Sequence, residues 1–111
     1  MIFGEDVPAV DAADVPDGAY LLDVREDDEW DAGHAPRAVH IPMSELGDRA
    51  GEVPQDTDVY VICRSGVRSA QVTVALNNAG WQTLNVDGGM ERWVQSGREL
   101  TTETGSKPYV A

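Results

Sequence analysis

The sequence predicts an α/β domain built on a mainly parallel sheet that is covered by helices on both faces. Short apolar runs at residues 20–24, 59–62 and 83–86 have the length and composition of buried parallel strands. Segments with helical character separate these runs, and strands that alternate with helices are typical of this class. The chain has 111 residues, which is the size of one domain.

Local signals place the remaining elements. Weaker strands are expected at residues 7–10 and 39–41, and the proline beside each favours a sheet edge or a strand end. Asp11 and Ser44 are suited to cap helices, whereas Gly33 is suited to end one. Helical segments are expected at residues 11–15, 26–32, 44–49, 68–79 and 89–95.

Helical spacing predicts which side chains the last two of these helices bury. The predicted buried set is Val72, Ala75, Leu76 and Ala79 in the longer helix, and Met90, Trp93 and Val94 in the final one.

The strong negative charge excludes some partners. The net charge is −12, from 20 acidic and 8 basic residues. Nucleic acids and anionic membranes both require a basic surface, so we expect neither as a partner. No apolar run approaches the ~20 residues of a membrane helix, and the first residues lack the pattern of a signal peptide. These features predict a cytoplasmic protein.

A single cysteine, Cys63, limits the chemistry further. An intramolecular disulfide needs two cysteines, and no second thiol is present to resolve an adduct on the first. One cysteine and two histidines also fall short of an ordinary structural zinc site. We therefore expect neither a metal nor another cofactor.

The segment at residues 63–69, CRSGVRS, carries the strongest functional signal. It joins the strand expected at residues 59–62 to the longest helix, and Gly66 permits a tight loop there. In such a loop, successive backbone N–H groups converge on one point, and the positive end of the helix dipole adds to them. Arg64 and Arg68 add two cations, so the pattern predicts that Cys63 is a stabilised, reactive thiolate.

This loop and three other segments resemble the rhodanese-like sulfurtransferase family. The other segments are LLDVRE, GHAPRAVHIP and VDGGMERW, at residues 21–26, 33–42 and 86–93. They occur in the family's order, and the resemblance as a whole spans about residues 7–97. The resemblance implies a five-stranded parallel sheet within a rhodanese-like domain at residues 1–99. The polar segment 100–111 would be an extension over the surface or a partly disordered tail.

The resemblance also implies a mechanism. Cys63 would attack the outer sulfur of a donor such as thiosulfate, releasing sulfite and leaving a persulfide. A thiol, cyanide or a protein acceptor would then remove the sulfur, which predicts ping-pong kinetics. Arg64 and Arg68 would hold the donor's sulfonate oxygens. The persulfide would lie among the backbone N–H groups of Ser65, Gly66, Val67, Arg68 and Ser69.

Several nearby polar residues are expected to have structural roles. Asp23 is expected to cap the Cys63 loop, and Arg25 to be tied to an acid such as Glu26 or Glu29. The two histidines, His34 and His40, and the three tryptophans are expected to serve packing. The acidic runs at residues 26–29 and 45–48 are expected to be solvated faces. One departure from the family is Arg37, which stands where a glycine is usual and brings a further cation near the site.

Three alternatives to a free-standing sulfurtransferase stay open. The first is a sulfur carrier that is loaded by a partner enzyme and uses the same persulfide. The second is a regulatory module, although such modules often lack the loop cysteine. The third is a phosphatase or arsenate reductase, whose loop would be one residue longer than the interval between Cys63 and Arg68.

Overall fold

The computed structural model describes residues 7–111 and contains a five-stranded sheet in which all strand pairs are parallel. The strand order is β1-β5-β4-β2-β3, so the two strands expected beside prolines form the two edges. The bounds are β1 Ala9–Asp11, β2 Tyr20–Asp23, β3 Val39–His40, β4 Val59–Ile62 and β5 Thr83–Asp87. The predicted parallel α/β fold is confirmed.

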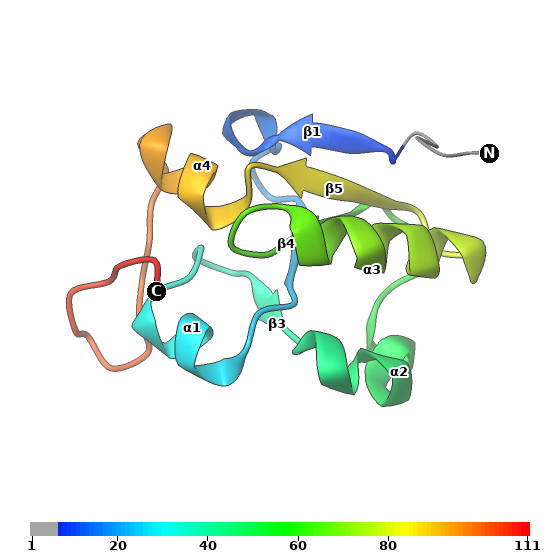
Figure 1. The fold of residues 1–111 in the computed structure, drawn as a ribbon, viewed down its shortest axis with the longest axis horizontal. Helices are drawn as coiled ribbons and strands as arrows, with labels where there is room; N and C mark the ends of the chain where they lie inside the picture. Colours follow the sequence, from blue (N-terminus) through cyan, green and yellow to red (C-terminus); the bar gives the residue numbers. More distant parts are fainter. Residues whose placement is uncertain (1–6) are drawn as a thin grey trace.

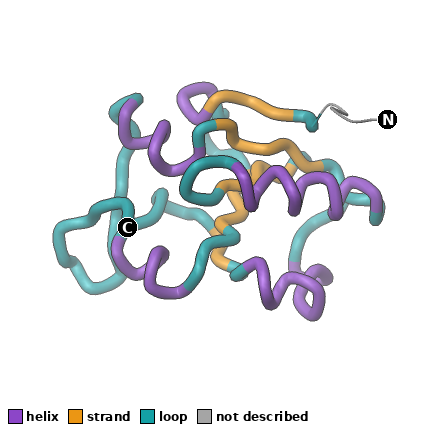
Figure 2. The backbone as a smooth tube through the Cα atoms, in the orientation of Figure 1, coloured by secondary structure: helices purple, strands orange, loops and turns teal. Residues whose placement is uncertain are grey.

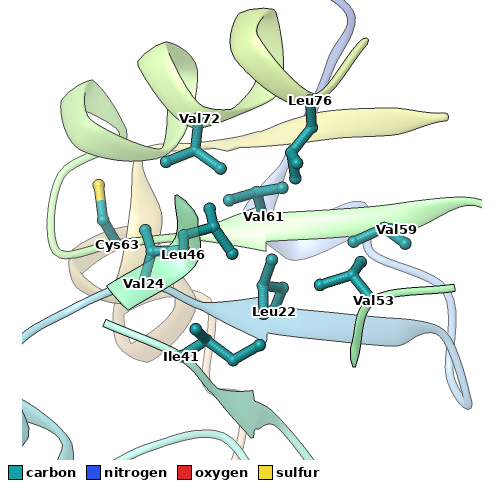
Figure 3. Packing of buried hydrophobic residues seen from close by; sticks show 10 residues of the cluster. All are labelled: Leu22, Val24, Ile41, Leu46, Val53, Val59, Val61, Cys63, Val72 and Leu76. Carbon is teal, nitrogen blue, oxygen red and sulfur yellow. The ribbon is translucent and has the colours of Figure 1, made fainter. Parts of the chain in front are cut away.

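Helices cover both faces of this sheet (Figures 1 and 2). The α-helices are α1 Asp27–Ala32, α2 Leu46–Arg49, α3 Val67–Asn78 and α4 Gly89–Gln95; three 3-10 turns are η1 Ala12–Asp14, η2 Met43–Glu45 and η3 Ala50–Glu52. The α2 and α3 helices pack on one face through an aliphatic cluster, part of which Figure 3 shows. On the other face, η1 and α4 enclose a second cluster around Ile62, Val86 and Trp93.

Burial along the two long helices differs in part from the prediction. Val72 and Leu76 of α3 are buried, but Ala75 and Ala79 are exposed. The buried face instead continues through Ser69 and Thr73, because α3 lies over the end of β4 and its polar first turn faces the Cys63 sulfur. In α4, Met90 and Trp93 are buried as expected, whereas Val94 is 41% exposed.

The predicted cap at Ser44 is wrong. The segment begins as a 3-10 turn at Met43, and neither that turn nor α2 has a side-chain cap. Pro42, in an extended conformation, starts the turn, so Ser44 lies inside it.

Residues 100–111 return to the sheet's second face and to α1. The N–H of Tyr109 donates to the carbonyl of Ala32, and Thr101 exchanges backbone hydrogen bonds with His34. A Cβ on Gly33 would lie only 2.6 Å from the Tyr109 carbonyl oxygen, so the segment passes directly over this glycine. The predicted domain limits of 1–99 stay a prediction, and residues 1–6 lie outside the described part of the chain.

No helix within residues 7–111 is both long enough and apolar enough to cross a bilayer.

Candidate functional site

Cys63 lies at the carboxyl end of β4, in the loop that leads into α3. Sites in parallel α/β sheets form at this edge. Gly66 has a φ of 103°, and a Cβ there would lie 3.2 Å from the Gly88 nitrogen. The left-handed conformation and the close neighbour both favour glycine, which lets the loop turn back over the cysteine. Figure 3 shows the sulfur directed toward the first turn of α3.

Three polar groups surround the Cys63 sulfur. The N–H groups of Gly66 and Ser69 donate to Sγ at 3.1 and 3.3 Å, and the Ser69 hydroxyl oxygen lies 3.2 Å from it. Cys63 is 1% exposed, so these donors act on the sulfur with little competition from water. The sulfur therefore lies in a pocket of hydrogen-bond donors formed by the loop and the first turn of α3.

Only some of the backbone N–H groups that were predicted to surround the sulfur contact it. Of the five residues whose N–H groups were expected to face it, Gly66 and Ser69 donate to Sγ. Ser65 is exposed and Val67 is 65% exposed, so this side of the loop faces the surroundings. The loop therefore presents one exposed apolar side chain, Val67, beside a buried sulfur.

The start of α4 supports the loop from behind. The N–H groups of Met90 and Glu91 donate to the carbonyl oxygens of Cys63 and Arg64, at 2.8 and 3.0 Å. This approach requires Gly89, because a Cβ there would lie 2.5 Å from both of those carbonyl oxygens. Gly89, the first residue of α4, thus lets the helix approach the sulfur loop closely enough to hold its position.

Arg68 is held by an acid. Its Nη1 and Nη2 donate to the two carboxylate oxygens of Glu29 at 2.8 and 2.9 Å. The Arg68 hydrogen bonds lower the pKa of Glu29 to about 2, so the carboxylate is ionised at neutral pH. Glu29 was expected on a solvated face, but its side chain is only 16% exposed because α1 packs it against the start of α3.

Arg64 is paired more loosely. Its Nε lies 3.2 Å from a carboxylate oxygen of Glu91, and both side chains are about half exposed, at 53% and 46%. Exposed pairs of this kind contribute only about 0–1 kcal/mol, so the Arg64 side chain is easily released.

Asp23 and Arg25 form a fully buried pair beside the loop. The Arg25 Nε donates to both carboxylate oxygens of Asp23, and its Nη2 donates to Asp23 and to the Gly33 carbonyl oxygen. Both side chains are 0% exposed. Arg25 is tied to an acid as expected, but this acid is Asp23 rather than Glu26 or Glu29. The expected cap of the Cys63 loop by Asp23 is wrong, because Asp23 accepts hydrogen bonds from Arg25. The turn after β2 brings the two side chains together.

The histidines pack around Trp30. The rings of His34 and His40 each stack on it, with centroids 3.5 and 4.7 Å away. His34 Nε2 also lies 2.8 Å from a carboxylate oxygen of Glu103. Arg37, the departure noted in the sequence, is the one non-glycine residue with positive φ in the described chain (68°). It lines a separate cavity with Trp93 and Arg98.

Sequence reasoning missed two contributors to the site, Glu29 and Gly89. Gly89 lies in a segment that resembles the family, whereas Glu29 lies between two such segments. Their contacts to the Cys63 carbonyl and to Arg68 join parts of the chain that are far apart. No local pattern reports such contacts. Within residues 7–111, no group of three His, Cys, Asp or Glu side chains is arranged to hold a metal.

Comparison with known proteins agrees with this geometry. The family model for the rhodanese-like domain matches residues 9–96. Bacillus subtilis YtwF, provisionally named a sulfurtransferase, is 45% identical over 74 residues, which are 67% of this chain and 72% of that protein. Bacillus subtilis YrkF, provisionally named a sulfur carrier protein, is 37% identical over 81 residues, which are 72% of this chain but only 44% of that protein.

A solved structure shows the same fold. The crystal structure of a rhodanese-related protein from Thermoplasma volcanium superposes with a TM-score of 0.82 at 31% identity. The match covers 86% of this chain and 99% of that one, so the two domains share nearly their whole architecture.

Proposed function

The chain belongs to the rhodanese-like domain family, and from that premise we propose that it transfers a sulfane sulfur through a persulfide on Cys63. One observation carries the proposal. The Cys63 sulfur is buried, and it accepts hydrogen bonds from two backbone N–H groups beside a serine hydroxyl. This environment suits a sulfur that must be anionic both before and after it gains a second sulfur atom.

The loading step is a displacement at sulfur. With thiosulfate as donor, the Cys63 thiolate attacks the outer sulfur, and the bond between the two thiosulfate sulfurs breaks. Sulfite leaves with the electron pair of that bond, and Cys63 keeps a terminal anionic sulfur. The N–H groups of Gly66 and Ser69 are close enough to stabilise this persulfide after small shifts.

The unloading step is a second displacement. A nucleophile such as cyanide, a small thiol or a protein thiol attacks the terminal sulfur, and Cys63 leaves as a thiolate. With cyanide the product is thiocyanate, and no proton or external electron is needed. We place this chemistry in the cytoplasm, where a single thiol stays reduced between cycles.

A sulfur carrier that serves a partner protein is the second candidate. The exposed Val67 beside the sulfur gives a partner an apolar contact, and YrkF is a relative named for carrying sulfur. The carrier function predicts slow loading from thiosulfate and fast loading from a desulfurase that holds its own persulfide. The sulfurtransferase function predicts rapid turnover of thiosulfate and cyanide by the isolated protein.

Intact-mass measurement tests the shared persulfide. Incubation with thiosulfate or another sulfane-sulfur donor is expected to add the mass of one sulfur atom, which dithiothreitol or cyanide removes. Cys63→Ser is expected to abolish the addition, because the chain has no other thiol. A wild-type protein that gains no sulfur from any donor tested would exclude both candidate functions.

A further inference from the structure

Two arginines lie in the segment 63–69, a third follows the neighbouring strand β2, and each of the three is paired with its own carboxylate. Arg25 pairs with Asp23, Arg64 with Glu91 and Arg68 with Glu29. These three pairs add no net charge to the site, in a chain whose total charge is −12. The Nη1 of Arg25 has no hydrogen-bond partner, but this side chain is fully buried. Within residues 7–111, a doubly charged sulfonate donor therefore meets no exposed, unpaired guanidinium among these three arginines.

Of the three exposed or buried pairs, the one between Arg68 and Glu29 is the pair in which a donor anion would have most difficulty displacing the carboxylate from a loop arginine. It has two short hydrogen bonds in fork-to-fork geometry, and the side chains are only 33% and 16% exposed. Glu29 is itself fixed in place, because its Oε1 accepts a hydrogen bond from the N–H of Glu26 in the capping box of α1. The Arg64 pair, by contrast, is half exposed and held through a single nitrogen.

Arg68 is also the arginine closest in sequence to the groups that bind sulfur. It precedes Ser69, whose N–H donates to Sγ. The Glu29 hydrogen bonds raise the pKa of Arg68, and the charge of the nearby Cys63 adds to this effect. Arg68 thus lies next to a sulfur-binding residue while Glu29 accepts one hydrogen bond from each of its two terminal nitrogens.

We propose that Glu29 selects the sulfur donor: by occupying Arg68 it disfavours thiosulfate and similar sulfonate dianions and favours alkyl persulfides. This inference rests on the proposed function and names its donor class. An alkyl persulfide needs no sulfonate site. The Cys63 thiolate attacks its outer sulfur, the S–S bond breaks, and the organic thiolate leaves with the electron pair and takes up a proton.

The substitution Glu29→Gln separates this selection from a purely structural role. Glutamine keeps an oxygen that can accept from the Glu26 N–H, so α1 stays capped. It removes the negative charge that neutralises Arg68, and the guanidinium becomes available to a sulfonate. Glu45→Gln is the control for loss of one paired carboxylate, since Glu45 pairs through one hydrogen bond with Arg49 of α2, away from the Cys63 loop (Figure 1).

The experiment compares loading rates of Cys63, followed by quenched intact-mass measurement, for thiosulfate and for 2-hydroxyethyl persulfide. Glu29→Gln is expected to raise the ratio of the thiosulfate rate to the persulfide rate by about tenfold or more, which is the usual effect of one charged hydrogen bond. Glu45→Gln is expected to leave the ratio unchanged. An unchanged or lower ratio in Glu29→Gln, with both donors still loading, overturns the inference but leaves the proposed function in place.

A second measurement uses the wild-type protein and does not depend on sulfur transfer. Iodoacetate and iodoacetamide alkylate thiolates and differ mainly in charge. The rate ratio of iodoacetate to iodoacetamide at Cys63 is expected to be at least about tenfold lower than for free 2-mercaptoethanol. A ratio equal to or above that of the free thiol would show a cationic site and would contradict the role of Glu29. Loading from neither sulfur donor would remove the proposed function and this inference together.

Discussion

At the scale of single residues, the site is defined by the hydrogen bonds to the Cys63 sulfur and by the ion pairs of the arginines near it. The sequence placed Cys63 and its loop correctly, because a glycine and two arginines next to a cysteine form a local pattern. It did not place Glu29, whose partner is 39 residues away along the chain. The same carboxylate anchors α1 and neutralises Arg68, so its ionisation affects stability as well as donor choice.

This dual role predicts a specific dependence of stability on pH. The pKa of Glu29 in the folded protein is about 2, well below its ordinary value of 4.5, because Arg68 donates two hydrogen bonds to it. A lowered folded-state pKa contributes stability above pH 4.5, and this contribution is lost as the pH falls toward 2. The difference in unfolding free energy between wild type and Glu29→Gln is therefore expected to shrink by about 2 kcal/mol over that interval.

Urea unfolding of both proteins at pH values between about 6 and 3 measures this difference. Glu45→Gln again serves as the control for a general loss of one carboxylate. If the difference between wild type and Glu29→Gln is the same at both ends of that range, the Arg68 pair contributes nothing through ionisation, and its assignment is wrong.

At the scale of elements, most strands and helices followed from local patterns. The strand at Val59–Ile62 and the helix at Gly89–Gln95 have the predicted limits, because an apolar run and a Gly-Gly start are local signals. The buried face of α3 did not follow from its apolar residues. Ser69 is buried because its hydroxyl meets the Cys63 sulfur at the end of β4. Thr73 is buried against β5, where the Thr83 hydroxyl donates to its backbone carbonyl.

The packing of α4 behind the sulfur loop predicts the effect of Gly89→Ala. The added Cβ would meet the Cys63 and Arg64 carbonyl oxygens at 2.5 Å, so the loop must move and the Met90 hydrogen bond must weaken. We expect a loss of about 2–4 kcal/mol in unfolding free energy and at least tenfold slower sulfur loading.

Gly97→Ala is the matched control for Gly89→Ala, since Gly97 also has positive φ (85°) but nothing within 4 Å of an added Cβ. It is expected to cost only about 1–2 kcal/mol of backbone strain and to load sulfur at the wild-type rate. Equal effects of the two substitutions on the loading rate would contradict the supporting role of α4.

At the scale of the whole molecule, charge and chain path matter most. The polar segment 100–111 gave no periodic signal, yet it returns to contact Ala32 and His34. Such a path depends on long-range backbone contacts, which composition does not report. The net charge of −12, in contrast, is fixed by the sequence and acts on every anionic donor.

This negative charge predicts that added salt raises the rate of loading from an anionic donor, whereas salt would lower that rate in an enzyme with a basic active site. Ions screen repulsion beyond about 8 Å at physiological ionic strength, so added salt is expected to speed loading from thiosulfate. Rates measured from about 0.02 to 0.5 M sodium chloride should rise several-fold for thiosulfate and stay nearly constant for iodoacetamide, which is uncharged. A thiosulfate rate that falls with salt would show that a cationic surface attracts the donor.

The most direct measurement follows the two sulfur atoms of thiosulfate separately, using radioactive sulfur in either the outer or the inner position. Label from the outer sulfur alone is expected to become attached to Cys63 and to be released by cyanide as thiocyanate. Label from the inner sulfur is expected to leave as sulfite. Retention of inner label on the protein, or attachment of outer label to Cys63→Ser, would show that Cys63 does not form the persulfide proposed for it.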